Sequence, residues 1–351
     1  MTIRPLFRSR RVAAVLAASA LVLAACGGSD EPAAPAPAPA PAPDAPAADA
    51  EVCDTIPEFI TIGTGGTGGV YYPLGGAVGD LLGRTIDGVR GATAEVTGGS
   101  VANLNLIHAG EAEIGLAQGD AVVNGYNGLE PFEGPRDFLT IGLAYVNFAQ
   151  WVSYEGSSVQ SWEDIPGSRF STGDAGSATN TFTLNVLAAL GISVDDFTEQ
   201  RLPFADQTTA MINKQLDAGS WVVGLGASSI LELANAEQIV FLDFTDEQVA
   251  QIVAAHPYYA PAIIPAGTYP GQDEDVQSIG TWNSWVVAAD ASECFVYEVT
   301  KALYENVETV GAAVPAGNLL STDNLQFKLT PLHPGAIKYF EEIGIDASVL
   351  N

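Results

Sequence analysis

Three glycines with the spacing of a nucleotide-binding loop open the globular part of the chain. Gly63, Gly65 and Gly68, within ITIGTGGTGGVYYPLGG, match the pattern G-x-G-x-x-G. A dinucleotide site also needs an acidic residue about 20 positions further on, at the tip of the next strand. Here the next predicted strand ends in TGGS (residues 97–100), without an acid, and no Lys-Ser/Thr pair follows Gly68 as in a Walker A loop. We therefore predict that the protein uses no nucleotide cofactor, and no other cofactor is indicated.

The same glycine chemistry recurs at two further turns, residues 98–100 (GGS) and residues 173–177 (GDAGS). Glycine lets the backbone adopt positive φ and approach a ligand closely. The N–H groups at a helix start carry partial positive charge and favour anions. Three such turns facing one cleft could bind a carboxylate without a dedicated arginine. Ordinary tight turns are the alternative explanation.

Residues suited to catalysis or metal binding are few. The three histidines are His108, His256 and His333, and the last two precede prolines. The chain contains no H-E-x-x-H, G-x-S-x-G or C-x-x-C motif. We predict that the protein is not an enzyme and has no metal site. An exported hydrolase is the alternative, and it would need a general base beside a nucleophile.

The elements that position these turns alternate between strand and helix. Periodicity predicts strands at residues 59–63, 92–96, 113–117, 168–172, 221–225 and 239–242, and helices at residues 75–82, 101–108, 180–190, 207–216 and 295–307. This alternation predicts an α/β fold with a mostly parallel sheet.

Two longer extended runs interrupt the alternation, at residues 141–154 and 278–288. They indicate that the chain leaves one lobe, builds a second and returns, with a ligand cleft between the lobes. We expect residues 54–148 to form the first part of lobe 1, residues 149–284 to form lobe 2, and residues 285–351 to complete lobe 1.

The N-terminus indicates export and lipid anchoring. Four arginines precede an apolar stretch at residues 12–25, which is too short to span a membrane and is followed by Cys26 in the lipobox-like sequence LAAC. We predict a lipoprotein signal peptide over residues 1–25 and lipidation of Cys26. Residues 26–53 are rich in proline and alanine and are expected to form an extended tether. The body would then lie outside the cytoplasm (in the periplasm), anchored to the membrane.

The cysteines indicate a disulfide, and the net charge limits which partners the protein can bind. With Cys26 lipidated, Cys53 and Cys294 remain in an oxidising compartment; we predict a disulfide between them, two separate thiols being the alternative. The chain has 13 basic and 42 acidic residues, a net charge of −29. Such a surface repels nucleic acid, which we exclude as a partner. Solubility at high ionic strength and a cationic ligand both remain explanations of the charge.

Several blocks of the sequence resemble one family. FITIGTGGTGGVYYPLGG, TGGSVANLNLIHAGEAEIGLAQGD, HPYYAPAIIPAGTYPGQDEDV, VYEVTKALYEN and LTPLHPGAIKYFEEIG are similar, in order from about residue 58 to 345, to the TAXI-type solute-binding subunits of TRAP transporters. The resemblance implies a two-lobed, periplasmic-binding-protein-like (type II) α/β fold with a hinge. It implies a receptor that captures a small organic anion, such as glutamate or 2-oxoglutarate, and delivers it to an ion-gradient-driven permease with fused small and large subunits.

The resemblance also implies which residues contact the solute. On the first lobe these are Gly66, Tyr71, Ser100, Asn103 and Gln118, and on the second lobe Gly176, Ser177 and Thr179. A ligand-sensing input module for a membrane signalling protein is the alternative function.

Overall fold

The structure, a computed structural model, describes residues 55–350. The predicted signal peptide, the tether, Cys26 and Cys53 lie outside the described residues. Cys294 is disulfide-bonded, and its pairing with Cys53 stays a prediction. Among the described residues, no helix has the length and apolar character needed to cross a membrane.

The described chain alternates strands and helices for most of its length. Its strands are β1 (Phe59–Gly63), β2 (Gly91–Glu95), β3 (Ile114–Gln118), β4 (Phe138–Tyr154), β5 (Arg169–Ser171), β6 (Thr198–Gln200), β7 (Ala218–Val223), β8 (Ile239–Phe241), β9 (Ala260–Ile264) and β10 (Val276–Ala288). Its α-helices are α1 (Tyr71–Thr85), α2 (Ser100–Ala109), α3 (Gly119–Asn127), α4 (Ala178–Ala189), α5 (Phe204–Ile212), α6 (Ser228–Ala236), α7 (Asp246–Ala255), α8 (Glu293–Glu305), α9 (Val307–Ala313), α10 (Pro334–Glu342) and α11 (Ala347–Leu350).

Two long strands, β4 and β10, connect the two halves of the sheet. The main strand order is β2-β1-β3-β10-β4-β7-β5-β6, with β8 on β4 and β9 on β10. The pairs β1–β2, β1–β3, β5–β6 and β5–β7 are parallel, whereas β4 and β10 pair antiparallel with each other and with every neighbouring strand. The predicted mostly parallel sheet is therefore wrong: the sheet is mixed, because one crossing strand leaves the first half and the other returns to it.

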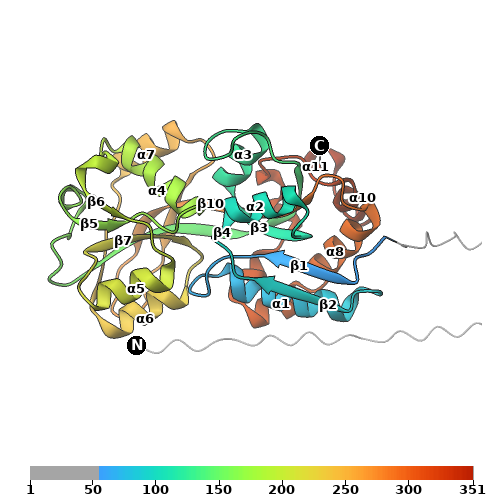
Figure 1. Ribbon diagram of the computed structural model, residues 1–351, viewed down its shortest axis with the longest axis horizontal. Helices are drawn as coiled ribbons and strands as arrows, with labels where there is room; N and C mark the ends of the chain where they lie inside the picture. The colour runs from blue at the N-terminus through green and yellow to red at the C-terminus, as the bar shows by residue number, and fades with distance from the viewer. Residues whose placement is uncertain (1–54, 351) are drawn as a thin grey trace, which may run out of the picture. The chain divides into compact units, whose positions relative to one another are not determined.

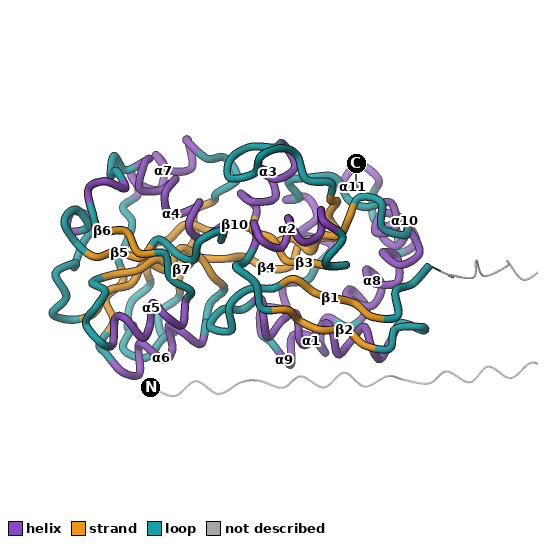
Figure 2. Tube along the Cα trace, in the orientation of Figure 1, coloured by secondary structure: helices purple, strands orange, loops and turns teal. Residues whose placement is uncertain are grey.

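Helices cover both faces of this sheet (Figures 1 and 2). In the first half α2 and α3 lie on one face and α1 on the other; in the second half α4 and α7 lie opposite α5 and α6. After β10 the chain continues into α8, which packs against α1 and α10 in the first half. The predicted α/β, two-lobed, type II periplasmic-binding-protein-like fold is confirmed by this topology.

Each half has apolar side chains that stabilise it. Ile62, Leu116 and Trp285 are buried in the larger cluster, which also extends into the second half through residues such as Trp221 and Ile230. In the second half, Trp151 and Phe170 belong to a separate buried cluster. Removal of this apolar surface from water favours folding by about 25 cal/mol per Å².

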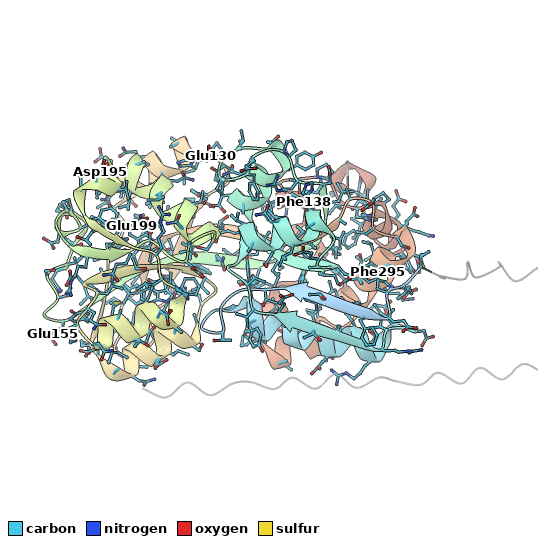
Figure 3. The ribbon with its side chains drawn as sticks, viewed as in Figure 1. Glu130, Phe138, Glu155, Asp195, Glu199 and Phe295 are labelled. Carbon is cyan, nitrogen blue, oxygen red and sulfur yellow. The ribbon has the colours of Figure 1, made fainter. Side chains whose placement is uncertain are left out.

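Acidic side chains are spread over the outside of both halves. Glu130, Glu155 and Asp195, which lie far apart along the chain, are all exposed (Figure 3). Dispersed carboxylates of this kind stay hydrated and repel one another only weakly at physiological salt. The large negative charge is thus mainly a property of the surface.

Candidate functional site

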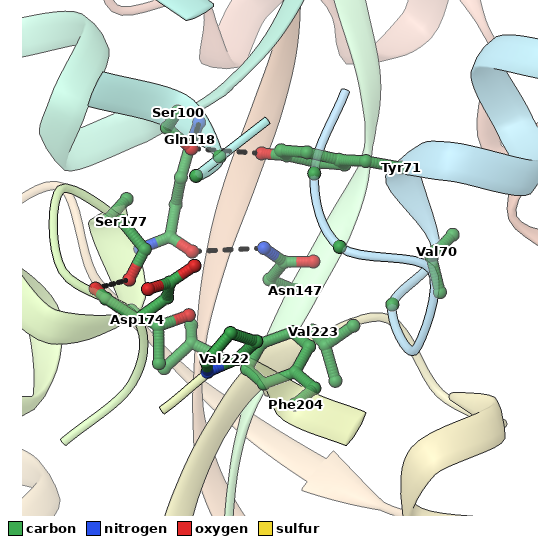
Figure 4. Close-up of a pocket in the computed structure, with 18 of the residues that line it drawn as sticks. Val70, Tyr71, Ser100, Gln118, Asn147, Asp174, Ser177, Phe204, Val222 and Val223 are labelled. Atoms are coloured by element: carbon green, nitrogen blue, oxygen red, sulfur yellow. Dashed lines mark hydrogen bonds between the residues drawn. The ribbon is translucent and has the colours of Figure 1, made fainter. Parts of the chain in front are cut away.

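A cavity lies between the two halves, at the carboxyl ends of the parallel strands (Figure 4). The first half contributes the β1–α1 loop, the β2–α2 turn and the end of β3; the second contributes the β5–α4 turn, the start of α5 and the end of β7. The crossing strand β4 contributes Tyr145 and Asn147. The lining residues are Gly65, Gly66, Gly69, Val70, Tyr71, Gly98, Gly99, Ser100, Gln118, Tyr145, Asn147, Asp174, Ser177, Ala178, Thr179, Pro203, Phe204, Val222 and Val223.

Five helices begin at this cavity. The N-cap residues of α1, α2, α3, α4 and α5 are Val70, Gly99, Gln118, Ser177 and Pro203, and all five line it. The first N–H groups of a helix have no partner within the helix, and the helix dipole gives them partial positive charge. Gly99 has φ +101°, a backbone conformation that residues with a side chain rarely adopt. Glycine is therefore needed at this position, where α2 begins. The cavity is therefore suited to an anion.

Hydrogen bonds link the polar side chains on the first-half wall. The Tyr71 hydroxyl donates to Asn283 Oδ1 and lies 3.3 Å from Ser100 Oγ, which accepts from the Gln118 N–H at 3.1 Å. Asn147 Nδ2 donates to Gln118 Oε1 at 3.0 Å and to Asn283 Oδ1 at 3.1 Å. These bonds hold the wall in one arrangement before any solute enters.

Asn283 joins this network because of an irregularity in β10. The register of β10 against β4 shifts between Trp282 and Ser284, so Asn283 falls at a bulge. Bulges change the direction of a side chain and are common beside functional sites. Asn283 Nδ2 donates to the Tyr145 carbonyl at 2.9 Å, which ties the two crossing strands together directly behind the cavity.

A buried carboxylate lies directly behind this wall. Asp120, at the start of α3, is fully buried and accepts from Gln118 Nε2 at 3.0 Å and from the Tyr259 hydroxyl at 3.0 Å. Burial raises the pKa of Asp120 to about 6, although the hydrogen bond from Tyr259 opposes the shift. Because Tyr259 follows α7 in the second half, Asp120 connects the wall to both halves.

The second-half wall is less connected. Ser177 Oγ accepts from the Asn180 N–H at 3.1 Å and donates to the Asp174 carbonyl at 2.7 Å, both within its own turn. The Asp174 carboxylate points toward the cavity in Figure 4. Burial raises the pKa of Asp174; a hydrogen bond from the Ala175 backbone lowers it, and the neighbouring charge of Asp206 raises it.

The two halves contact each other around the cavity. Ser229 Oγ, at the start of α6, donates to the Gly68 carbonyl at 2.9 Å. A Cβ atom at Gly68 would lie 3.1 Å from the backbone nitrogen of Ala205, and one at Gly98 would lie 3.4 Å from the Ala175 carbonyl oxygen. The glycine turns therefore allow the halves to approach each other backbone to backbone.

The structure brings together most of the residues that the sequence assigned to the site. Six of the eight line the cavity, namely Gly66, Tyr71, Ser100, Gln118, Ser177 and Thr179. Their contact with a solute stays a prediction.

The other two predicted residues lie outside the lining. Asn103 is fully buried, and its amide is used internally: Nδ2 donates to the Thr64 and Leu116 carbonyls at 2.6 and 2.8 Å, and Oδ1 accepts from Thr97. Asn103 therefore positions the glycine loop and does not face the cavity. Gly176 is exposed with φ +78°, so it shapes the turn without lining the cavity.

Sequence reasoning missed Tyr145, Asn147, Asp174 and Phe204 among the lining residues. A signal was present for Asn147 and for its partner Asn283. Both are amides inside otherwise apolar extended runs, and buried amides need hydrogen-bond partners. No comparable pattern marks Phe204, whose place depends on how α5 meets the cavity.

Comparison with solved structures gives distant similarities. The alkanesulfonate-binding protein SsuA of Xanthomonas axonopodis pv. citri, bound to MOPS, is 17% identical with a TM-score of 0.47, covering 84% of this chain and 82% of that chain. The periplasmic aliphatic sulphonate-binding protein SsuA of Escherichia coli is 13% identical (TM-score 0.43, covering 84% and 83%). An ancestral arginine-binding protein bound to arginine is 16% identical (TM-score 0.45, covering 74% and 98%). Because these sequence identities and TM-scores are low, the fold is assigned from the strand order described above.

Comparison with family models gives one match that spans both halves of the sheet and the cavity between them. The model of the NMT1-like family covers residues 62–344, which is more than half of the chain. This protein belongs to the NMT1-like family.

Proposed function

We propose that this protein is an extracytoplasmic solute-binding receptor that captures a small organic anion by closure of its two lobes. The observation that carries the proposal is the meeting of five helix N-termini at one cavity between the halves. Their N–H groups can hold a carboxylate through oriented dipoles, as at other anion sites built from backbone. The protein acts by binding and performs no reaction on the solute.

The lobe boundaries predicted from the sequence indicate where the hinge of this receptor lies. Lobe 1 is residues 54–148 with residues 285–351, and lobe 2 is residues 149–284, so both boundaries fall in or beside the crossing strands β4 and β10. Bending of two strands would open the cavity to solvent. Closure is favoured only by contacts made in the closed state, including those of the solute.

The sequence blocks described above favour a TAXI-type receptor of a TRAP transporter. In this assignment the closed receptor delivers a glutamate- or 2-oxoglutarate-like carboxylate to a permease with fused small and large subunits, driven by an ion gradient. The lipobox-like sequence supports anchoring through Cys26. Incorporation of labelled fatty acid that is lost in Cys26→Ser would support the anchor, and labelling that persists would contradict it.

Thermal unfolding with a panel of C4–C6 dicarboxylates and acidic amino acids tests the binding proposal. A true ligand at 100 times its dissociation constant stabilises the folded state by about 2.7 kcal/mol, a rise in melting temperature of roughly 4 °C for a body of this size. Neutral diamides of the same carbon skeletons are the matched controls and should have no effect. The proposal is wrong if no carboxylate changes the melting temperature while polyamines raise it.

A further inference from the structure

Two polar atoms of the cavity lining have no partner among the described residues: the Tyr145 hydroxyl, which can donate or accept, and one atom of the Asn147 amide. The network around Asn147 determines that this atom is the oxygen, which can only accept. The Asp120 carboxylate can only accept, so Gln118 turns its Nε2 toward Asp120 and its Oε1 toward Asn147. The Tyr145 carbonyl can only accept, so Asn283 turns its Nδ2 to that carbonyl and its Oδ1 toward Asn147. Both neighbours present oxygen, and Asn147 must donate its Nδ2 to them.

Asn147 Oδ1 is therefore left without a hydrogen bond from any described residue. The residue lines the cavity and its side chain is only 3% exposed. A buried acceptor without a donor costs about 1–3 kcal/mol. A solute that donates a hydrogen bond at this point would remove that cost, whereas a solute carboxylate could not.

The Asp174 carboxylate is a second acceptor directed at the cavity (Figure 4). Among the described residues that line the cavity, Asp174 has the only charged side chain, and none is Lys, Arg or His. A carboxylate that loses water on closure needs a positive partner or a proton donor. The lining therefore favours anions at the helix starts and a cation at Asp174.

We infer that the solute is a zwitterion whose protonated amine is bound by Asp174 and Asn147 Oδ1 and whose carboxylate is bound at the helix N-termini. A free amino acid fits this description, whereas an oxo acid or a plain dicarboxylate leaves both acceptors without a donor. The inference rests on the proposed function and selects among its carboxylates.

Matched pairs that differ only at the amine test the inference by calorimetry on the full-length protein. The probes are L-glutamate with 2-oxoglutarate, L-alanine with pyruvate, and L-leucine with 4-methyl-2-oxopentanoate. In the pair that binds, we expect the amino acid to bind at least tenfold tighter than its oxo partner. Equal or tighter binding of the oxo acid would overturn the inference while leaving the proposed function intact.

Asp174→Asn isolates the charge. Asparagine keeps an oxygen that can accept from the Ala175 N–H, so the turn should fold as before. The amino acid should lose at least tenfold in affinity and the oxo acid less than threefold. Asp206→Asn is the control, because it removes an equal charge nearby from an exposed residue outside the lining, and it should change neither affinity more than about twofold.

Two results of these measurements would count against the inference in different ways. If Asp174→Asn weakens both members of a pair equally, Asp174 supports the turn and does not bind the amine. If no member of any pair binds, the anion receptor itself is wrong, and the zwitterion with it.

Discussion

The two walls of the cavity differ in how far their polar groups are already paired. On the first-lobe wall, Tyr71, Ser100 and Gln118 are hydrogen-bonded to one another or to amides on the crossing strands. On the second-lobe wall, Ser177 is bonded only within its own turn, and Asp174 directs its carboxylate at the cavity. The first wall is thus preorganised by the fold, and in the proposed receptor the second wall completes the site when the lobes close.

This difference separates two kinds of contribution to binding. Preorganised groups lose little conformational entropy when a solute arrives, so changes to them should affect folding and binding together. Groups that meet the solute only on closure should affect binding with little effect on folding. Variants on the two sides of the cavity can therefore test the comparison directly.

The largest effect is expected from Asn283→Ala, behind the first wall. The substitution removes the acceptor of Tyr71 and Asn147 and leaves the Tyr145 carbonyl without its donor. Buried groups left unpaired cost about 1–3 kcal/mol each, so we expect a loss of about 4 kcal/mol. For about 300 residues this lowers the melting temperature by roughly 6 °C, and solute binding should weaken as well.

Asn235→Ala is the control for that loss. Asn235 is an exposed asparagine on α6 whose amide donates only to the Leu231 carbonyl. We expect its melting temperature to change by less than about 1 °C, since exposed substitutions usually stay within 0.5 kcal/mol. An Asn283→Ala protein that melts like the control would show that the first wall is not held by this network.

The pH dependence of stability tests whether the pKa of Asp120, the carboxylate behind the first wall, is raised in the folded protein. The pKa of Asp120 is raised from 3.8 to about 6 in the folded protein. Between these values the unfolded chain has released the proton and the folded chain has kept it. The contribution of Asp120 to stability therefore falls as pH rises from about 4 to about 6, by about 3 kcal/mol. Asp120→Asn lacks this contribution.

Melting temperatures of both proteins across pH 4–7 measure the effect. The other carboxyl groups titrate in both proteins, so the difference between the two curves isolates Asp120. We expect that difference to grow in favour of Asp120→Asn by roughly 5 °C over the interval. Parallel curves would mean that Asp120 releases its proton at the same pH in the folded and in the unfolded chain.

The sequence predicted the positions of the main-chain turns better than those of the side chains. Glycine turns at residues 98–100 and 173–177 could be placed at one cleft because strand–turn–helix units put their turns at the same edge of a sheet. Asn103 lies outside the lining, and the sequence does not reveal this, because the pattern of a polar residue on a helix is the same whether its side chain faces the cavity or the Thr64 carbonyl. That choice depends on helix rotation, which periodicity alone does not give.

The mixed parallel and antiparallel pairing of the sheet also could not be predicted from sequence patterns. The long runs at residues 141–154 and 278–288 do become β4 and β10. Their antiparallel pairing is a long-range contact, however, and a continuous apolar run does not reveal which neighbour it pairs with. The bulge that turns Asn283 toward the cavity follows from that same pairing.

Closure itself can be weakened at Gly68. An alanine there would place its Cβ 3.1 Å from the Ala205 nitrogen and 3.2 Å from Ser229 Cβ, both across the gap between lobes. The lobes can relieve this contact by closing less far. We expect solute affinity to fall about tenfold, in line with overpacking costs of about 1–3 kcal/mol, while the melting temperature without solute stays nearly constant.

Gly76→Ala, on α1, is the matched glycine control. A Cβ atom at Gly76 meets nothing within 4 Å, and alanine favours a helix over glycine by roughly 1 kcal/mol. This variant should melt slightly higher and bind the solute as the wild type does. If Gly68→Ala binds equally well, the contact across the gap is not part of the bound state.

The smallest effect is expected from a helix cap on the second wall. Ser177→Ala removes the oxygen that accepts from the Asn180 N–H at the start of α4. Thr245→Ala removes the same kind of cap from α7, where Thr245 Oγ1 accepts from the Gln248 N–H. Each should lower stability by about 1 kcal/mol, seen as a fall of roughly 1.5 °C in melting temperature.

Only the Ser177 variant should also change binding, because Ser177 lines the cavity and Thr245 does not. Its hydroxyl additionally donates to the Asp174 carbonyl, so its loss loosens the turn that carries the carboxylate. We expect about a threefold loss of affinity for Ser177→Ala and none for Thr245→Ala, measured by calorimetry with the tightest-binding solute. Equal affinities in the two variants would show that the Ser177 hydroxyl has no part in solute binding.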